Sequence, residues 1–80
     1  MDAKSSIIGN IVYKLRTYGD FQIDDVDIDM SGGQQGEVFK AERVFLDENN
    51  FPMVELENGE IIELEECDYN ELINLYDEIC

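Results

Sequence analysis

Acidic residues outnumber basic residues four to one in this chain of 80 residues, which has 20 Asp and Glu against five Lys and Arg. Ionised carboxylates are rarely buried, so the fold must keep nearly all of them at its surface. The core then comes from the apolar residues, which make up 44% of the sequence. That fraction suits a globular chain rather than a disordered one. A chain of this length predicts a single small acidic domain, residues 1–80, with a thin core.

The charge is unevenly spread along the chain. Residues 1–19 hold three basic residues and one acidic residue, whereas residues 20–80 hold two basic and 19 acidic residues. Such a surface repels phosphate, so we expect no direct binding to nucleic acid or to anionic membranes. No apolar run approaches the roughly 20 residues of a membrane span, and the first six residues lack a signal-peptide pattern. We therefore expect a cytoplasmic protein, and like-charge repulsion favours a monomer.

Two segments have the periodicity of amphipathic helices. In residues 4–18 the apolar face is formed by Ile8, Ile11, Val12, Leu15 and Tyr18. Gly19 is a natural stop for this helix, and Gly9 within it would allow close packing against a neighbour. In the last segment Asp68 and Glu71 form a variant capping box, ahead of an apolar face made of Leu72, Leu75, Tyr76 and Ile79.

Residues 21–30 predict a half-buried strand, because apolar and polar residues alternate. The apolar residues occupy odd positions at first and even positions from Val26 onward, which predicts a bend or bulge at Asp24-Asp25. Three aspartates, Asp25, Asp27 and Asp29, would line the outer face of this strand. The glycine-rich residues 31–36 predict a loop.

Residues 37–66 predict a three-stranded meander with strands over 37–46, 51–57 and 60–66. The turn before the last strand decides the register. A two-residue turn at Asn58-Gly59 would mix apolar and polar faces, whereas a three-residue turn over 57–59, with Gly59 left-handed, pairs Val54 with Ile62. We prefer the second register because it keeps the apolar face continuous.

The order of elements predicts an α+β fold, with a three- to four-stranded antiparallel sheet and the N-terminal and C-terminal helices packed on one face. The sheet would contribute one side of the core and the helices the other. The predicted core residues are Val44, Val54, Leu56, Ile62 and Leu64 against Ile8, Ile11, Leu15, Leu72, Leu75 and Ile79.

Residues that common enzyme chemistries require are missing from this sequence. There is no histidine, which removes Ser-His-Asp and Cys-His catalysis and imidazole metal sites. There is no phosphate-binding glycine loop, and neither Cys67 nor Cys80 has a CxxC partner. A helix between the two cysteines would hold them roughly 17–20 Å apart, too far for a disulfide, so we expect free thiols and a buried Cys67. We predict no enzymatic activity, no cofactor and no catalytic, cofactor-binding or metal-binding residues.

The best chemical candidate is the spacing Asp25-x-Asp27-x-Asp29, which resembles the start of a calcium-binding EF-hand loop. The resemblance ends at the sixth position, where Met30 replaces glycine, and at the twelfth, where Gly36 replaces glutamate. We favour a solvated strand face for these aspartates, and weak calcium binding stays open.

Four tyrosines lie on the two predicted helices. Tyr18 and Tyr76 occupy the apolar faces, so we expect them to pack in the core. Tyr13 and Tyr69 lie off these faces and are candidates for contact with a partner.

Four stretches of the sequence carry a resemblance to small acidic conserved hypothetical proteins of gut anaerobes, which are often found near mobile elements. They are Tyr18-Gly19-Asp20, Val44-Phe45-Leu46-Asp47-Glu48-Asn49, Glu57-Asn58-Gly59-Glu60 and Asp68-Tyr69-Asn70-Glu71-Leu72. The resemblance implies a compact α+β domain. It assigns no activity and no functional residue.

Two functional hypotheses follow from the acidic surface. The first is a non-catalytic protein-interaction module that binds a basic protein partner, because opposite charges speed association and select partners. The second is a DNA mimic that inhibits a nucleic-acid-binding protein. This alternative needs carboxylates in groove-like rows, which would form if the strands that carry them are neighbours, and the candidate residues are Asp25, Asp27, Asp29, Glu55, Glu63 and Glu65.

Overall fold

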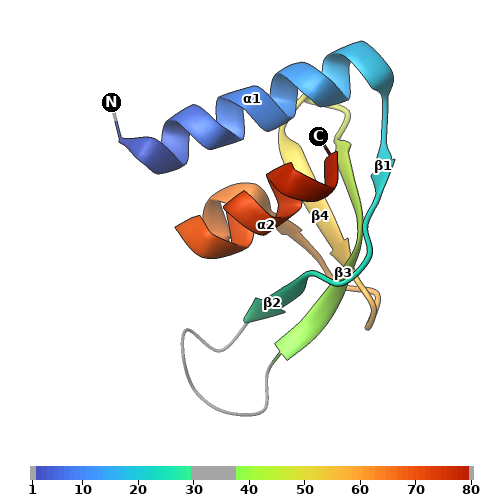
Figure 1. Cartoon of the computed structure of the whole chain (residues 1–80). Coiled ribbons are helices and arrows are strands. Elements are labelled where there is room, and N and C mark those ends of the chain that lie inside the picture. The colour runs from blue at the N-terminus through green and yellow to red at the C-terminus, as the bar shows by residue number, and fades with distance from the viewer. Residues whose placement is uncertain (1, 30–37, 80) are drawn as a thin grey trace.

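The computed structural model describes residues 2–29 and 38–79, which form two layers (Figure 1). An antiparallel sheet makes one layer, and the helices α1 (Ala3–Tyr18) and α2 (Tyr69–Ile79) both lie on one face of it. This arrangement confirms the predicted α+β fold. The strands are β1 (Phe21–Gln22), β2 (Asp27–Asp29), β3 (Val38–Leu46), β4 (Pro52–Leu56) and β5 (Ile61–Glu63), and a 3₁₀ turn η1 (Leu64–Glu66) leads into α2.

The helix α1 is closed at both ends by the residues beside it. The Ser5 N–H donates to Oδ1 of Asp2 at 2.7 Å, which lowers the pKa of the Asp2 carboxyl because the bond favours its charged form. At the other end Gly19 has a φ of +92° and donates its N–H to the Leu15 carbonyl at 2.9 Å. Gly19 therefore stops the helix as predicted, since this backbone region favours glycine.

Two expectations for α1 are wrong. A Cβ built on Gly9 would meet no atom within 4 Å, so this glycine does not mark a close contact. Tyr18 is 68% exposed rather than in the core. The chain reverses at Gly19, and Phe21 packs against the core in place of Tyr18. The Tyr18 ring lies edge-on to Phe21, with the ring centroids 6.3 Å apart.

The predicted strand over 21–30 is divided into β1 and β2, which both pair with β3. Five steps of chain, from Gln22 to Asp27, lie opposite three steps of β3, from Arg43 to Lys40. Two extra residues are therefore inserted, and Asp25 takes a left-handed φ of +61° among them. The bulge predicted at Asp24-Asp25 is confirmed. Met30 and the predicted loop over 31–36 lie outside the described residues.

The turn between β4 and β5 has the predicted three-residue form. Val54 pairs with Ile62, and the turn closes through the Leu56 N–H, which donates to the Glu60 carbonyl at 2.8 Å. Gly59 has a φ of +91°, in the left-handed region that the turn requires. The choice of register made from the apolar face is confirmed.

The last strand is shorter than predicted, because residues 64–66 form η1 instead of continuing β5. Met53 pairs with Glu63, so the next pair would place Leu64 opposite Pro52. Proline has no N–H to donate to a sheet. The ladder therefore ends there, and the chain turns toward α2.

The core lies between the helices and the sheet. Every residue of the predicted core is buried except Ile8, which is partly buried and packs against it. Cys67 is fully buried, as predicted. The structure adds to this core Ile23 and Val26 from the segment between β1 and β2, Ile28 of β2 and Ala41 of β3.

Gly59 and Gly9 give a matched pair of substitutions, because a Cβ added at either position meets no atom within 4 Å. Gly59→Ala should destabilise the domain by about 1–2 kcal/mol, because alanine is strained at the left-handed position. Gly9→Ala should stabilise it by about 1 kcal/mol, because the added methyl group meets open space in a helix. Urea unfolding at fixed ionic strength measures both changes. Equal effects of the two substitutions would contradict the assigned turn.

Candidate functional site

One edge of the sheet is lined by aspartates, which we call the acidic edge. In the described part of the chain β1 and β2 pair with β3 alone, so they form this border of the sheet. Asp24, Asp25 and Asp27 are exposed and Asp29 is half-buried. A bulge and a row of charges both discourage pairing with a further strand. The acidic edge consists of Asp20, Asp24, Asp25, Asp27 and Asp29.

The calcium-like spacing does not become a metal-binding cluster in the described residues. Within 2–29 and 38–79, no three His, Cys, Asp or Glu side chains converge closely enough to hold a metal ion. The bulge explains this for the aspartates, because Asp25 takes a left-handed φ outside the strand, whereas Asp27 and Asp29 share one face of β2. Met30 and Gly36, which would complete the loop, lie outside the described residues.

Glu71 is a buried carboxylate that joins α2 to the acidic edge. It is 9% exposed, and its Oε1 accepts the Asp68 N–H at 3.0 Å. The Glu71 N–H donates to Oδ1 of Asp68 at 2.8 Å, which confirms the predicted capping box. The second carboxylate oxygen, Oε2, accepts the Asp29 N–H at 2.6 Å. Backbone N–H groups from two elements therefore satisfy this buried charge.

Sequence reasoning found the capping box and missed the bond to β2. The spacing of Asp68 and Glu71 reveals a local pairing, whereas Asp29 is 42 residues away from Glu71. One signal was present in the sequence. A strand at the edge of a sheet has backbone N–H groups without a neighbouring strand, and such groups need an acceptor from elsewhere in the chain. Nothing in the sequence places α2 against that edge.

Arg43 connects the acidic edge to the middle of the sheet. Its Nη1 lies 3.0 Å from Oδ2 of Asp20, and its Nε lies 3.1 Å from Oε1 of Glu55. The guanidinium also covers the Phe45 ring, 4.3 Å from the ring centroid. Two carboxylates therefore already neutralise this cation.

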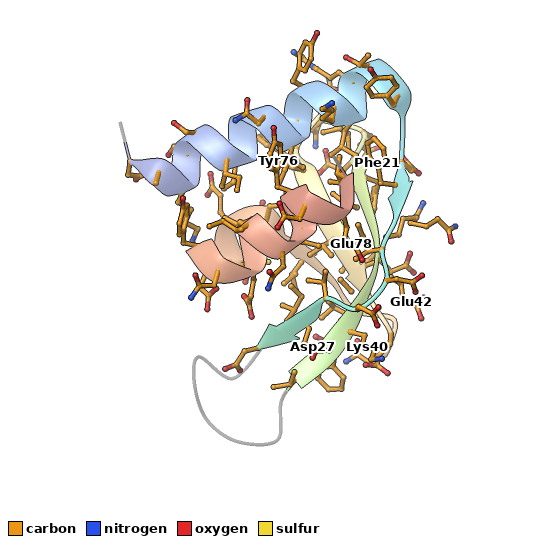
Figure 2. The ribbon with its side chains drawn as sticks, viewed as in Figure 1. Phe21, Asp27, Lys40, Glu42, Tyr76 and Glu78 are labelled. Carbon is orange, nitrogen blue, oxygen red and sulfur yellow. The ribbon has the colours of Figure 1, made fainter. Side chains whose placement is uncertain are left out.

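Other cations are placed beside acidic segments. Lys40 of β3 is opposite Asp27 in the sheet register, which places this cation at the acidic edge. The backbone N–H of Lys40, rather than its ammonium group, donates to Oε2 of Glu57 at 2.5 Å. Figure 2 shows Lys40 and Asp27 at the same end of the sheet. Lys4 of α1 donates its Nζ to the Glu65 carbonyl at 2.6 Å.

The carboxylate rows proposed for DNA mimicry are not neighbours. The strand β3 lies between β2 and β4, and it carries Lys40 and Arg43. Glu65 belongs to η1 and not to a strand. The aspartates of the acidic edge are therefore separated from Glu55 and Glu63 by a strand that bears positive charge.

Of the remaining tyrosines, one packs against the core and two are exposed, as their positions on the helices predicted. Tyr76 packs partly buried against the core and lies between the two helices in Figure 2. Tyr13 and Tyr69 are 66% and 44% exposed. Their proposed role as partner contacts stays a prediction.

The surroundings of Cys67 make its thiol unreactive. Burial, together with the nearby negative charge of Glu71, raises its pKa from 9.0 to about 12. The thiolate is the nucleophilic form of cysteine, so little of it is present at neutral pH. Cys67 serves the core, in agreement with its predicted place there.

Comparisons with protein-family models, curated proteins and solved structures found no match for this chain. The resemblance to acidic proteins of gut anaerobes therefore stays a prediction. Among the described residues, neither helix combines the length and the apolar character that crossing a bilayer requires.

The bond network of Glu71 predicts a large effect for a small substitution. Glu71→Gln replaces one accepting oxygen with an NH₂ group and leaves a backbone N–H of Asp29 or Asp68 without its acceptor. We expect a loss of about 1–3 kcal/mol in the free energy of unfolding, measured in urea. Glu78→Gln removes the same charge from an exposed position on α2 and should change stability by less than about 0.5 kcal/mol. Similar losses for both variants would contradict a specific role of Glu71.

The raised pKa of Cys67 predicts protection from alkylation. In a Cys80→Ser variant at pH 8, iodoacetamide should react with the folded domain at least about a hundredfold more slowly than with the urea-unfolded chain. Since the folded state holds this proton more tightly, its contribution to stability is complete below pH 9 and is lost as the pH rises toward 12. Equal alkylation rates in the two states would show that Cys67 is accessible.

Proposed function

We propose that this domain is a non-catalytic, cytoplasmic interaction module that binds a basic protein partner through the acidic edge. The observation that carries the proposal is the gathering of aspartates on one border of the sheet, beside a cation that is already paired. Five basic residues cannot balance 20 acidic ones, and Arg43 is committed to Asp20 and Glu55. A cationic partner would find a surface there whose carboxylates outnumber its cations, Lys40 and Arg43.

The physical basis of such binding is long-range attraction. Opposite potentials accelerate the encounter of two proteins and select against partners of the wrong charge. Exposed charges are screened within about 8–10 Å at physiological salt, so binding of this kind weakens as salt is added. The exposed positions of Asp24, Asp25 and Asp27 suit this mechanism.

The side chains near the acidic edge support binding rather than catalysis. A surface hollow of about 340 Å³ beside Arg43 is lined by polar and charged residues with one buried apolar residue, Ile23. Pockets for small substrates are mostly apolar, with a few convergent polar groups. The thiol of Cys67, a potential nucleophile, is buried in the core. These features support a protein that binds a partner through its surface and does not catalyse a reaction.

Two charge-reduced variants test the proposal. One carries Asp24→Asn, Asp25→Asn and Asp27→Asn on the acidic edge. The other carries Glu48→Gln, Asp77→Asn and Glu78→Gln, which are exposed elsewhere. Immobilised domain should retain a basic protein from the native host at about 50 mM salt and release it at about 500 mM. The edge variant should weaken binding of that purified protein about tenfold, and the control variant less than about threefold.

Three outcomes would contradict the proposal. Equal weakening by both triple variants would mean that total charge matters and the acidic edge does not. Displacement of the partner by duplex DNA at the same site would favour the DNA-mimic alternative instead. Failure to retain any basic protein at low salt would remove the support for both functions.

A further inference from the structure

The sheet has a second face, opposite the helices, which we call the outer face. Val44, Val54 and Ile62 are paired across β3, β4 and β5 and point into the core. Because side chains alternate along a strand, the residues on either side of them point the other way. The outer face therefore contains two cross-strand rows, Arg43–Glu55–Ile61 and Phe45–Met53–Glu63.

Three apolar side chains on the outer face come from three neighbouring strands. Phe45 and Met53 are directly opposite each other and half-buried, and Ile61 is 49% exposed on β5. Both helices contact the core face, so they cannot shield these residues. Three strands span two strand spacings, about 10 Å, which is close to the diameter of a helix with its side chains.

The charges around this apolar group indicate what kind of molecule could cover it. Glu55 and Glu63 flank the apolar side chains. Of the two cations that β3 places on this face, Arg43 is held by Asp20 and Glu55, and Lys40 lies farther along the strand, opposite Asp27. A second copy of the domain would bring two chains of net charge −15 together, which repulsion opposes. A partner with lysine or arginine beside its apolar residues would meet opposite charge at both flanks.

We propose that the outer face binds a basic amphipathic helix of a protein partner. Its apolar side chains would contact Phe45, Met53 and Ile61, and its flanking cations would lie beside Glu55 and Glu63. The inference rests on the proposed function, because it names the kind of segment that a basic partner presents. It adds a surface distinct from the acidic edge, and the two surfaces are joined by the Arg43–Asp20 ion pair.

Two synthetic peptides test the inference. Both have 18 residues and the same number of lysines, and the positions i, i+3, i+4 and i+7 are leucine in one and alanine in the other. At near-physiological salt the Lys–Leu peptide should bind at least about tenfold more tightly than the Lys–Ala peptide, measured by fluorescence anisotropy. Amide chemical shifts of the unmodified domain should change mainly over β3, β4 and β5.

Matched substitutions locate the apolar contribution. Met53→Ser with Ile61→Ser should bring the affinity for the Lys–Leu peptide to within about twofold of that for the Lys–Ala peptide. Tyr13→Ser with Tyr69→Ser should keep the difference, since these residues are 66% and 44% exposed and belong to the helices on the other face of the sheet.

The results separate this inference from the proposed function. Equal affinities for the two peptides, or shift changes confined to β1 and β2, would overturn the role of the outer face and leave a basic partner on the acidic edge. A failure of both peptides to bind would count against both proposals. A dimer in solution that Ile61→Ser converts to a monomer would place a second copy on this face and overturn the inference.

Discussion

The carboxylate of Glu71 ties the acidic edge to the helix layer, and the position of that edge depends on it. A buried charge without a cation is costly unless it is fully hydrogen-bonded. Here the N–H groups of Asp68 and Asp29 supply the bonds, one from the start of α2 and one from β2. The same bonds that pay for burying Glu71 hold a short, bulged strand in place beside the helix.

Arg43 joins the acidic edge to the face of the sheet that lies away from the helices. Its guanidinium bonds to Asp20 and Glu55 and stacks on Phe45, so one side chain links the acidic edge, β4 and the outer face. Partly exposed ion pairs contribute little stability on their own, so its main effect is on where charge is left. With this cation paired, the sheet presents carboxylates at its border and around a small apolar group.

Local features of the fold could be predicted because their causes are local. The shift of apolar residues from odd to even positions predicted the bulge at Asp25, and the need for one continuous apolar face chose the turn with Gly59. Tyr18 shows where this reasoning failed. Its position on the helical face was read correctly, but helical phase does not say where the sheet ends, and Phe21 occupies the space that Tyr18 was expected to fill.

The sequence by itself determined the two helices, the strands β3 and β4, the register of the last hairpin, most of the core residues and the excess of negative charge, because each depends on residues close together or on composition. Only the tertiary structure decided which carboxylate would be buried and which apolar residues would stay outside. The bond from Glu71 to Asp29 joins segments 42 residues apart. Both helices lie on one face of the sheet, as the sequence predicted, but only the register of the folded strands shows that Phe45, Met53 and Ile61 come together on the other face. Such choices depend on how whole layers pack, and no local pattern records that packing.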